Sequence, residues 1–180
     1  GAVEAGGLEA PPDAAATDPI KLGWMQGFPP PPEKAITFAD ERFRRFPEFR
    51  WAWSNIRQLV PTRNVWRGSG PASTLIRDEQ PLDRLPVTVW DGRRIDFGQA
   101  LAETYADGIV VLHKGRVVYE RYFGVLKAEG QHGAMSVTKS FVGTLAAMLT
   151  AEGKLDPEKR VDHYVPELAA SAFGSATVRQ

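Results

Sequence analysis

The sequence lacks cysteine, which excludes disulfide bonds, thiolate metal sites and a cysteine nucleophile. It also lacks an excess of charge of either sign, because 22 Lys and Arg balance 22 Asp and Glu. A neutral chain gives no electrostatic reason to expect nucleic acid or an anionic membrane surface as a partner. No apolar run approaches the roughly 18 residues that a membrane-spanning helix needs. We therefore expect neither a nucleic-acid partner nor a membrane span.

Features of a metal or cofactor site are also scarce. The three histidines do not combine with Asp or Glu at a spacing typical of metal ligands. No glycine-rich loop follows a predicted strand in a way that would cradle a phosphate. The acidic stretch 156–167 is interpreted as solvent-facing loop charges rather than as paired catalytic carboxylates. We expect no cofactor and no metal.

The chain has 180 residues, of which 43% are hydrophobic, and both values are typical of one globular domain. Residues 1–20 are rich in Ala, Gly, Pro and acidic residues, which predicts a flexible lead. They have no basic start and no apolar centre, so they are not an intact signal peptide. The processed look of this lead favours a periplasmic or secreted protein over a cytoplasmic one.

Residues 21–84 are rich in proline and aromatic residues. The four prolines at 29–32 favour a polyproline II conformation, which an SH3-like module could bind. Between residues 43 and 53, aromatic rings alternate with arginine, a pattern that can also stack on nucleic acid. The neutral total charge argues against nucleic acid. We interpret this segment as a strap that wraps the main body and buries Trp24, Met25 and Phe28.

Residues 85–180 carry the clearest signals of regular structure. Two β-rich runs, 109–112 and 117–122, flank the turn sequence "HKGR" and predict an antiparallel hairpin. Residues 136–152 predict a helix that ends at Gly153, because their apolar positions recur with helical spacing. These apolar positions are Val137, Phe141, Leu145, Met148 and Leu149.

Ser136 and Lys139 stand at the start of this helix, three residues apart, and therefore on the same face. A serine hydroxyl is a weak nucleophile until a neighbouring group accepts its proton. A lysine can do this where burial disfavours the charged ammonium. We therefore expect a nucleophilic Ser136 beside a buried Lys139. The residues alone leave two alternatives open: a serine that caps the helix, and a lysine whose stem lies along apolar surface.

The sequence "GAMSVTKSFVGTLAAMLTAEGKLDPEKRVDHYVPEL" resembles the nucleophile helix of the serine β-lactamase and penicillin-binding-protein superfamily, and the hairpin "GIVVLHKGRVVYERYF" resembles its early strands. The resemblance covers about residues 85–180. The aromatic lead is most similar to the 6-aminohexanoate-dimer hydrolase and esterase group of the class C-like branch. The implied fold is α+β, with antiparallel strands packed against a buried nucleophile helix. The resemblance implies that Ser136 is acylated, that Lys139 accepts or relays its proton, and that the Ser136 N–H is half of an oxyanion hole.

The resemblance also implies a tyrosine in a Y-x-N motif and a late H/K-T-G-like strand, both well downstream. No Y-x-N occurs in the chain, and 44 residues follow Ser136 (180 minus 136). We therefore expect residues 85–180 to be the N-terminal part of the domain. A second polypeptide segment, the C-terminal portion, is expected to complete the site, and this chain alone is expected to be inactive. His132, four residues before Ser136, is a candidate substrate-binding residue, with an exposed loop histidine as the alternative.

The predicted function is a serine hydrolase that cleaves a small-molecule amide or ester through an acyl-enzyme. A 6-aminohexanoate-oligomer-like amide or a carboxylic ester is the preferred substrate class, on the basis of the N-terminal lead. D,D-peptidase and β-lactamase activities remain alternatives within the superfamily. An alternative from another class is a non-catalytic binding protein built on the same scaffold.

Overall fold

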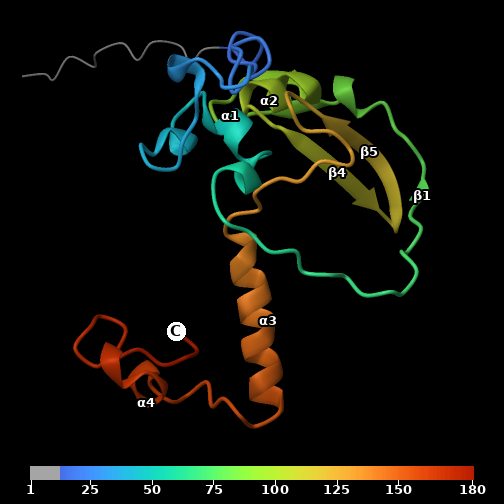
Figure 1. The fold of residues 1–180 in the computed structure, drawn as a ribbon. Coiled ribbons are helices and arrows are strands. Elements are labelled where there is room, and N and C mark those ends of the chain that lie inside the picture. Colours follow the sequence, from blue (N-terminus) through green and yellow to red (C-terminus); the bar gives the residue numbers. More distant parts are fainter. Residues whose placement is uncertain (1–12) are drawn as a thin grey trace, which may run out of the picture. The chain divides into compact units, whose positions relative to one another are not determined.

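The computed structural model describes residues 13–180, and the chain divides into two compact units between Gly133 and Ala134 (Figure 1). Most of the predicted flexible lead, residues 1–12, lies outside the described residues. Residues 13–20 form turns in which Thr17 and Pro19 are buried. The predicted boundaries at residues 20 and 84 stay predictions.

The N-terminal part of the first unit (residues 13–133) forms an aromatic core. Short helices lie in this part of the chain: η1 (Pro32–Lys34), η2 (Arg42–Arg44), α1 (Phe49–Ala52) and η3 (Ile56–Gln58). They bury one cluster, made of Trp24, Ile36, Phe43, Trp51 and Ala52. The predicted burial is therefore confirmed for Trp24, but it is wrong for Phe28, which is fully exposed. Gly27, next to Phe28, has a φ of 100°, which a residue without a Cβ adopts readily. The interpretation of residues 21–84 as a wrapping segment stays a prediction.

The predicted hairpin is confirmed as β4 (Gly108–His113) and β5 (Arg116–Tyr122), which pair antiparallel. Lys114 and Gly115 connect the strands with φ angles of 49° and 75°. Positive φ at both central residues is the requirement of a type I′ turn, whose twist matches that of the strands. The register shifts between the pairs Val111–Tyr119 and Leu112–Val117, which leaves Val118 of β5 as the extra residue of a β-bulge.

The sheet is mixed, so the expectation of antiparallel strands alone was wrong. The short strand β1 (Ile76–Arg77) pairs parallel with β5, giving the order β1-β5-β4, as Figure 1 shows. The extended chain continues along this edge, where Asp78 N–H donates to Val117 O at 2.9 Å and Gln80 N–H donates to Val118 O at 2.8 Å. These bonds satisfy backbone groups of β5 that would otherwise stay unpaired.

A second sheet pairs β2 (Pro86–Thr88) with β3 (Arg94–Asp96), and helix α2 (Phe97–Glu103) follows directly. Another short helix, η4 (Leu82–Arg84), precedes this sheet and brings Asp83 to Tyr119 of β5. The Tyr119 hydroxyl donates to Asp83 Oδ1 at 2.6 Å, and its ring is fully buried. Burial and then this carboxylate raise the pKa of Tyr119 to about 12, while the same bond lowers the pKa of Asp83.

The second unit (residues 134–180) holds α3 (Val137–Ala151), α4 (Val161–Tyr164) and η5 (Pro166–Leu168). The predicted end of the first of these helices is confirmed. Gly153 has a φ of 70°, and its N–H donates to Thr150 O at 3.0 Å. Lys154 N–H donates to Leu149 O at 2.9 Å, which completes a Schellman motif.

The predicted burial of the nucleophile helix is not observed. No residue of α3 is buried, although the apolar residues recur as predicted. The exposed fractions of Phe141 and Leu145 are 71% and 59%. Helical hydrogen bonds form within the segment, whereas burial needs other chain against the apolar face. Within residues 134–180, the remaining elements are too short to supply such a cover.

Between residues 13 and 180, no helix has the length and apolar character that crossing a bilayer requires. The same residues contain no group of three or more His, Asp or Glu side chains arranged to hold a metal ion.

Candidate nucleophile site

Ser136 and Lys139 meet as their spacing predicts. The Lys139 Nζ donates to Ser136 Oγ at 2.8 Å across the first turn of α3. Ser136 occupies the N-cap position, but its side chain makes no capping hydrogen bond to the helix. The alternative of a serine that caps the helix is therefore not what the structure has. The hydroxyl is held by the amine instead, within the distance at which a serine proton can pass to lysine once the amine is neutral and accepts the hydrogen bond.

The backbone before Ser136 is in an unusual conformation. Met135 has a φ of 48°, in the left-handed region that a side chain with a Cβ rarely adopts. Such outliers concentrate at functional sites, where surrounding contacts maintain the strain. Among the described residues, nothing accepts a hydrogen bond from the Ser136 N–H. This donor is therefore available for an oxyanion, as the resemblance implies.

The environment of Lys139 differs from the expectation. We expected a buried, desolvated amine, but both Ser136 and Lys139 are exposed. The cause is the exposure of α3 as a whole, since it has no buried residue. The distance between the two reacting groups is therefore set locally, while the low-polarity surroundings that would favour a neutral amine are missing from the described residues.

His132 belongs to the first unit and is held at both ring nitrogens. Its Nε2 lies 2.9 Å from Asp107 Oδ2, and its Nδ1 lies 3.1 Å from Gly133 O. The Asp107 side chain is only 10% exposed, so the histidine is bound to a fixed carboxylate. The next residue is fixed too, because Gly133 N–H donates to Trp53 O at 2.7 Å. The role of His132 in substrate binding stays a prediction.

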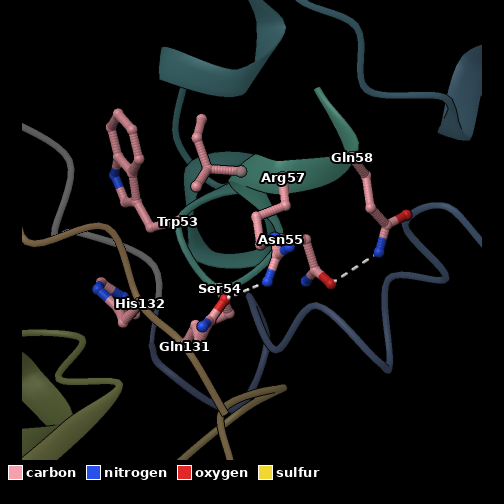
Figure 2. Close-up of a pocket in the computed structure, with 8 residues that line it drawn as sticks. Trp53, Ser54, Asn55, Arg57, Gln58, Gln131 and His132 are labelled. Atoms are coloured by element: carbon pink, nitrogen blue, oxygen red, sulfur yellow. Dashed lines mark hydrogen bonds between the residues drawn. The ribbon is translucent and has the colours of Figure 1, made fainter. Parts of the chain in front are cut away.

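Sequence reasoning missed Asp107. It lies 25 residues before His132, and no motif links the two positions. His132 also lines a cavity of about 490 Å³ within the first unit, beside Trp53 and Gln131 (Figure 2). The residues from 53 to 58 that line this cavity carried no functional signal in the sequence.

The profile of the beta-lactamase family matches residues 97–180, which include Ser136 and Lys139. Residues 97–180 are therefore a fragment of a beta-lactamase-family domain. This match confirms the resemblance found in the nucleophile helix and the hairpin. The part matched by the family profile begins with α2 and contains the β4–β5 hairpin and all of the second unit.

Two of the three similar proteins described next carry the name 6-aminohexanoate-dimer hydrolase, and the third is named a beta-lactamase. The chain is 32% identical to the 6-aminohexanoate-dimer hydrolase of Paenarthrobacter ureafaciens over 171 residues, 94% of this chain. It is 46% identical to a beta-lactamase of Providencia stuartii over 43 residues, 24% of this chain and 11% of the relative. A solved structure from Bacillus anthracis, provisionally assigned as a 6-aminohexanoate-dimer hydrolase, superposes with a TM-score of 0.69 at 27% identity over 80% of this chain.

The chain spans little more than a third of these hydrolases. It covers 36% of the Paenarthrobacter protein and 38% of the Bacillus chain. The TM-score therefore describes a shared part of the fold: mixed α/β structure with small sheets that matches a β-lactamase-fold hydrolase.

Proposed function

We propose that this chain carries the nucleophile of a serine hydrolase that cleaves an amide or an ester through an acyl-enzyme. The observation that supports the proposal is the 2.8 Å contact between Lys139 Nζ and Ser136 Oγ, with a hydroxyl that is not used as a helix cap. The match of residues 97–180 to the beta-lactamase family supports the same reaction class.

In the proposed reaction, Ser136 Oγ forms a bond to the substrate carbonyl carbon while its proton passes to a neutral Lys139 Nζ. The carbonyl oxygen becomes an oxyanion, and the free N–H of Ser136 donates a hydrogen bond to it. The bond to the leaving amine or alcohol then breaks, and that group takes up the proton. Water attacks the acyl-enzyme by the same sequence of steps, which releases the acid and restores Ser136.

We propose a linear amide of the 6-aminohexanoate type, or a carboxylic ester, as the substrate class. The support is the relatedness over 94% of this chain to a protein named 6-aminohexanoate-dimer hydrolase. That relatedness includes the aromatic core of the first unit, which lies before the segment that the family profile matches.

A second polypeptide segment, the C-terminal portion, is the proposed partner. Three observations support this: the exposed apolar face of α3, the exposed Lys139, and the coverage of little more than a third of the relatives. Such a segment would supply the second oxyanion donor and a further base. It would also desolvate the amine, which favours the neutral form that accepts the serine proton.

Covalent labelling tests the proposal. A fluorophosphonate should add one adduct to Ser136 in the protein as its native source produces it, located by peptide mass spectrometry. Ser136→Ala should abolish the adduct, whereas Ser140→Ala, one turn further along the exposed side of the helix, should leave it unchanged. Labelling that survives in Ser136→Ala would contradict the assignment of the nucleophile. A protein that never labels, yet binds small amides, would favour the non-catalytic binding alternative.

β-Lactam hydrolysis is the second candidate, favoured by the 46% identity to a beta-lactamase over 43 residues. Measuring the turnover of a chromogenic cephalosporin and of a 6-aminohexanoate dimer under the same conditions distinguishes the two activities. We expect faster turnover of the linear amide, and the reverse order would move the assignment to a β-lactamase.

A further inference from the structure

The cavity of the first unit in Figure 2 is lined by both polar and apolar side chains. It has a volume of about 490 Å³, within the range of small-molecule sites. Arg57, Gln131 and Ser54 are among its polar lining residues, and Trp53 and Ile56 supply apolar surface. All of these residues belong to residues 13–133, so the cavity is formed within one unit.

Arg57 keeps most of its hydrogen-bonding capacity. Its Nη1 donates to Gln131 Oε1 at 3.1 Å, and within residues 13–180 it makes no ion pair with a carboxylate. A guanidinium has five N–H donors in a planar fork, which matches the two oxygens of a carboxylate. Several donors of Arg57 are therefore free for a ligand.

Ser54 supplies a second, independent observation. Its Oγ is buried and has no hydrogen-bond partner among the described residues. Buried hydroxyls are nearly always paired in folded proteins, so an unpaired one beside a cavity indicates a missing polar partner.

The charge and shape of the cavity restrict the ligand further. No acidic side chain lines the cavity. Both ring nitrogens of His132 already have partners, so His132 lines the cavity without offering a free hydrogen-bonding group. Arg57 therefore brings the single permanent charge. One positive charge among neutral donors suits a monoanion better than a phosphate dianion. Trp53 and Ile56 suit an aliphatic chain attached to that monoanion.

We infer that this cavity binds a small aliphatic carboxylate, with Arg57 holding the carboxylate and the Trp53 side holding the chain. The inference uses residues of the first unit only and does not depend on Ser136. It adds a ligand site of defined chemistry to the unit that contains the aromatic core.

Titration with hexanoate, followed by NMR of the backbone amides at 54–58 and 131–132, tests the inference. Saturable shifts are expected in the intact chain, and Arg57→Gln should weaken the affinity about tenfold or more, since a charge-assisted bidentate contact is lost. Arg57→Lys should recover part of the affinity. Arg63→Gln is the matched control, because Arg63 is exposed and lines no cavity that the structure describes. An affinity that Arg57→Gln leaves unchanged would overturn the inference.

Two further ligands separate the carboxylate from its alternatives. Hexanamide has the same chain without the charge and should bind about tenfold more weakly, and inorganic phosphate should not compete with hexanoate. Equal binding of hexanamide, or displacement by phosphate at the same concentration, would overturn the assignment. Ser136→Ala should bind hexanoate like the parent chain. Loss of labelling at Ser136 therefore bears on the proposed hydrolase, whereas the titration bears on the cavity.

Discussion

The two units of this chain differ in how far their apolar side chains are buried. In the first unit Ala52 and Tyr119 have no exposed surface, and Trp51 is 7% exposed. In the second unit, Phe141 is 71% exposed on a helix that buries no residue. Both units contain many apolar residues, so composition does not cause the difference. The comparison teaches that a segment can reach its secondary structure through local hydrogen bonds while its burial depends on other parts of a protein.

A hydrogen-bonded pair of polar side chains in each unit also differs in how far it is buried. Tyr119 is buried and bonds the half-exposed carboxylate of Asp83, and both groups have shifted pKa values. Ser136 and Lys139 meet at a similar distance, 2.8 Å, but on an exposed turn. Local geometry brings a hydroxyl and an amine together, and the surroundings decide how reactive they become.

The largest effect is expected at the exposed pair. Lys139→Ala should lower the rate of Ser136 acylation by about 10²–10⁴-fold, because the proton acceptor is lost. Lys139→Arg should be nearly as slow, since a guanidinium stays protonated and therefore cannot accept the serine proton. The rates are measured with an activated ester in the protein as its native source produces it. Lys154→Ala is the control, and an equal loss there would remove the special role of Lys139.

Core truncation tests the contrast in burial directly. Trp51→Ala should destabilise the 180-residue chain by about 3–5 kcal/mol, because it removes a large buried ring. Phe141→Ala should change stability by less than about 0.5 kcal/mol, since its ring is mostly exposed. Denaturant unfolding followed by fluorescence and circular dichroism measures both. A cost for Phe141→Ala near that of Trp51→Ala would mean that the apolar face of α3 is covered in solution.

Two glycines of the second unit should respond with opposite signs. Gly153→Ala should destabilise α3 by about 1–2 kcal/mol, because the C′ residue has a φ of 70° that an alanine adopts only with strain. Gly143→Ala should stabilise the helix by about 0.5–1 kcal/mol, since it is helical and a Cβ there meets nothing within 4 Å. Amide hydrogen exchange across 137–151 measures both changes in helix stability. If both substitutions stabilised the helix, or both destabilised it, the view that local interactions determine its stability would be contradicted.

The smallest effect concerns the pH range of the first unit. The pKa of Asp83 is lowered, chiefly by the Tyr119 hydroxyl, so its contribution is complete above the ordinary value of 3.8 and is lost as the pH falls through the lowered value. The pKa of Tyr119 is raised to about 12, so its contribution is complete below 10.0 and is lost as the pH rises through 12.

Tyr119→Phe should therefore flatten both ends of the stability profile, which thermal unfolding between pH 3 and pH 12 would measure. Tyr164→Phe is the control, because the Tyr164 hydroxyl accepts a hydrogen bond from the Asp156 N–H and bonds no carboxylate among the described residues. A profile that Tyr119→Phe leaves unchanged would show that this hydrogen bond does not control the pH dependence.

Much of the local structure could be predicted from particular residues. Alternation around Lys114 and Gly115 predicted the hairpin, and the apolar spacing after Ser136 predicted α3 with its end at Gly153. The spacing of Ser136 and Lys139 predicted their contact. Each of these features depends on residues within a few positions of one another, where backbone geometry fixes the distances.

Features that join distant residues could not be predicted. The parallel pairing of β1 with β5 brings together residues about 40 positions apart, and no alternation marks a strand of two residues. The contact of Asp107 with His132 and the cavity between residues 53–58 and 131–132 have the same origin. The predicted burial of Lys139 was wrong for a related reason, because a helix sequence shows which face is apolar but not what covers it.

The sequence by itself determined the neutral, cysteine-free composition, the hairpin, the helix with its glycine end, and the family resemblance of the serine and lysine on one turn. These follow from steric limits and periodicity within short stretches. Only the tertiary structure decided which rings form the core, which edge of β5 is paired, and that Arg57, Ser54 and Gln131 share a cavity. Such choices depend on contacts between distant segments, whose free energies no short stretch of sequence contains.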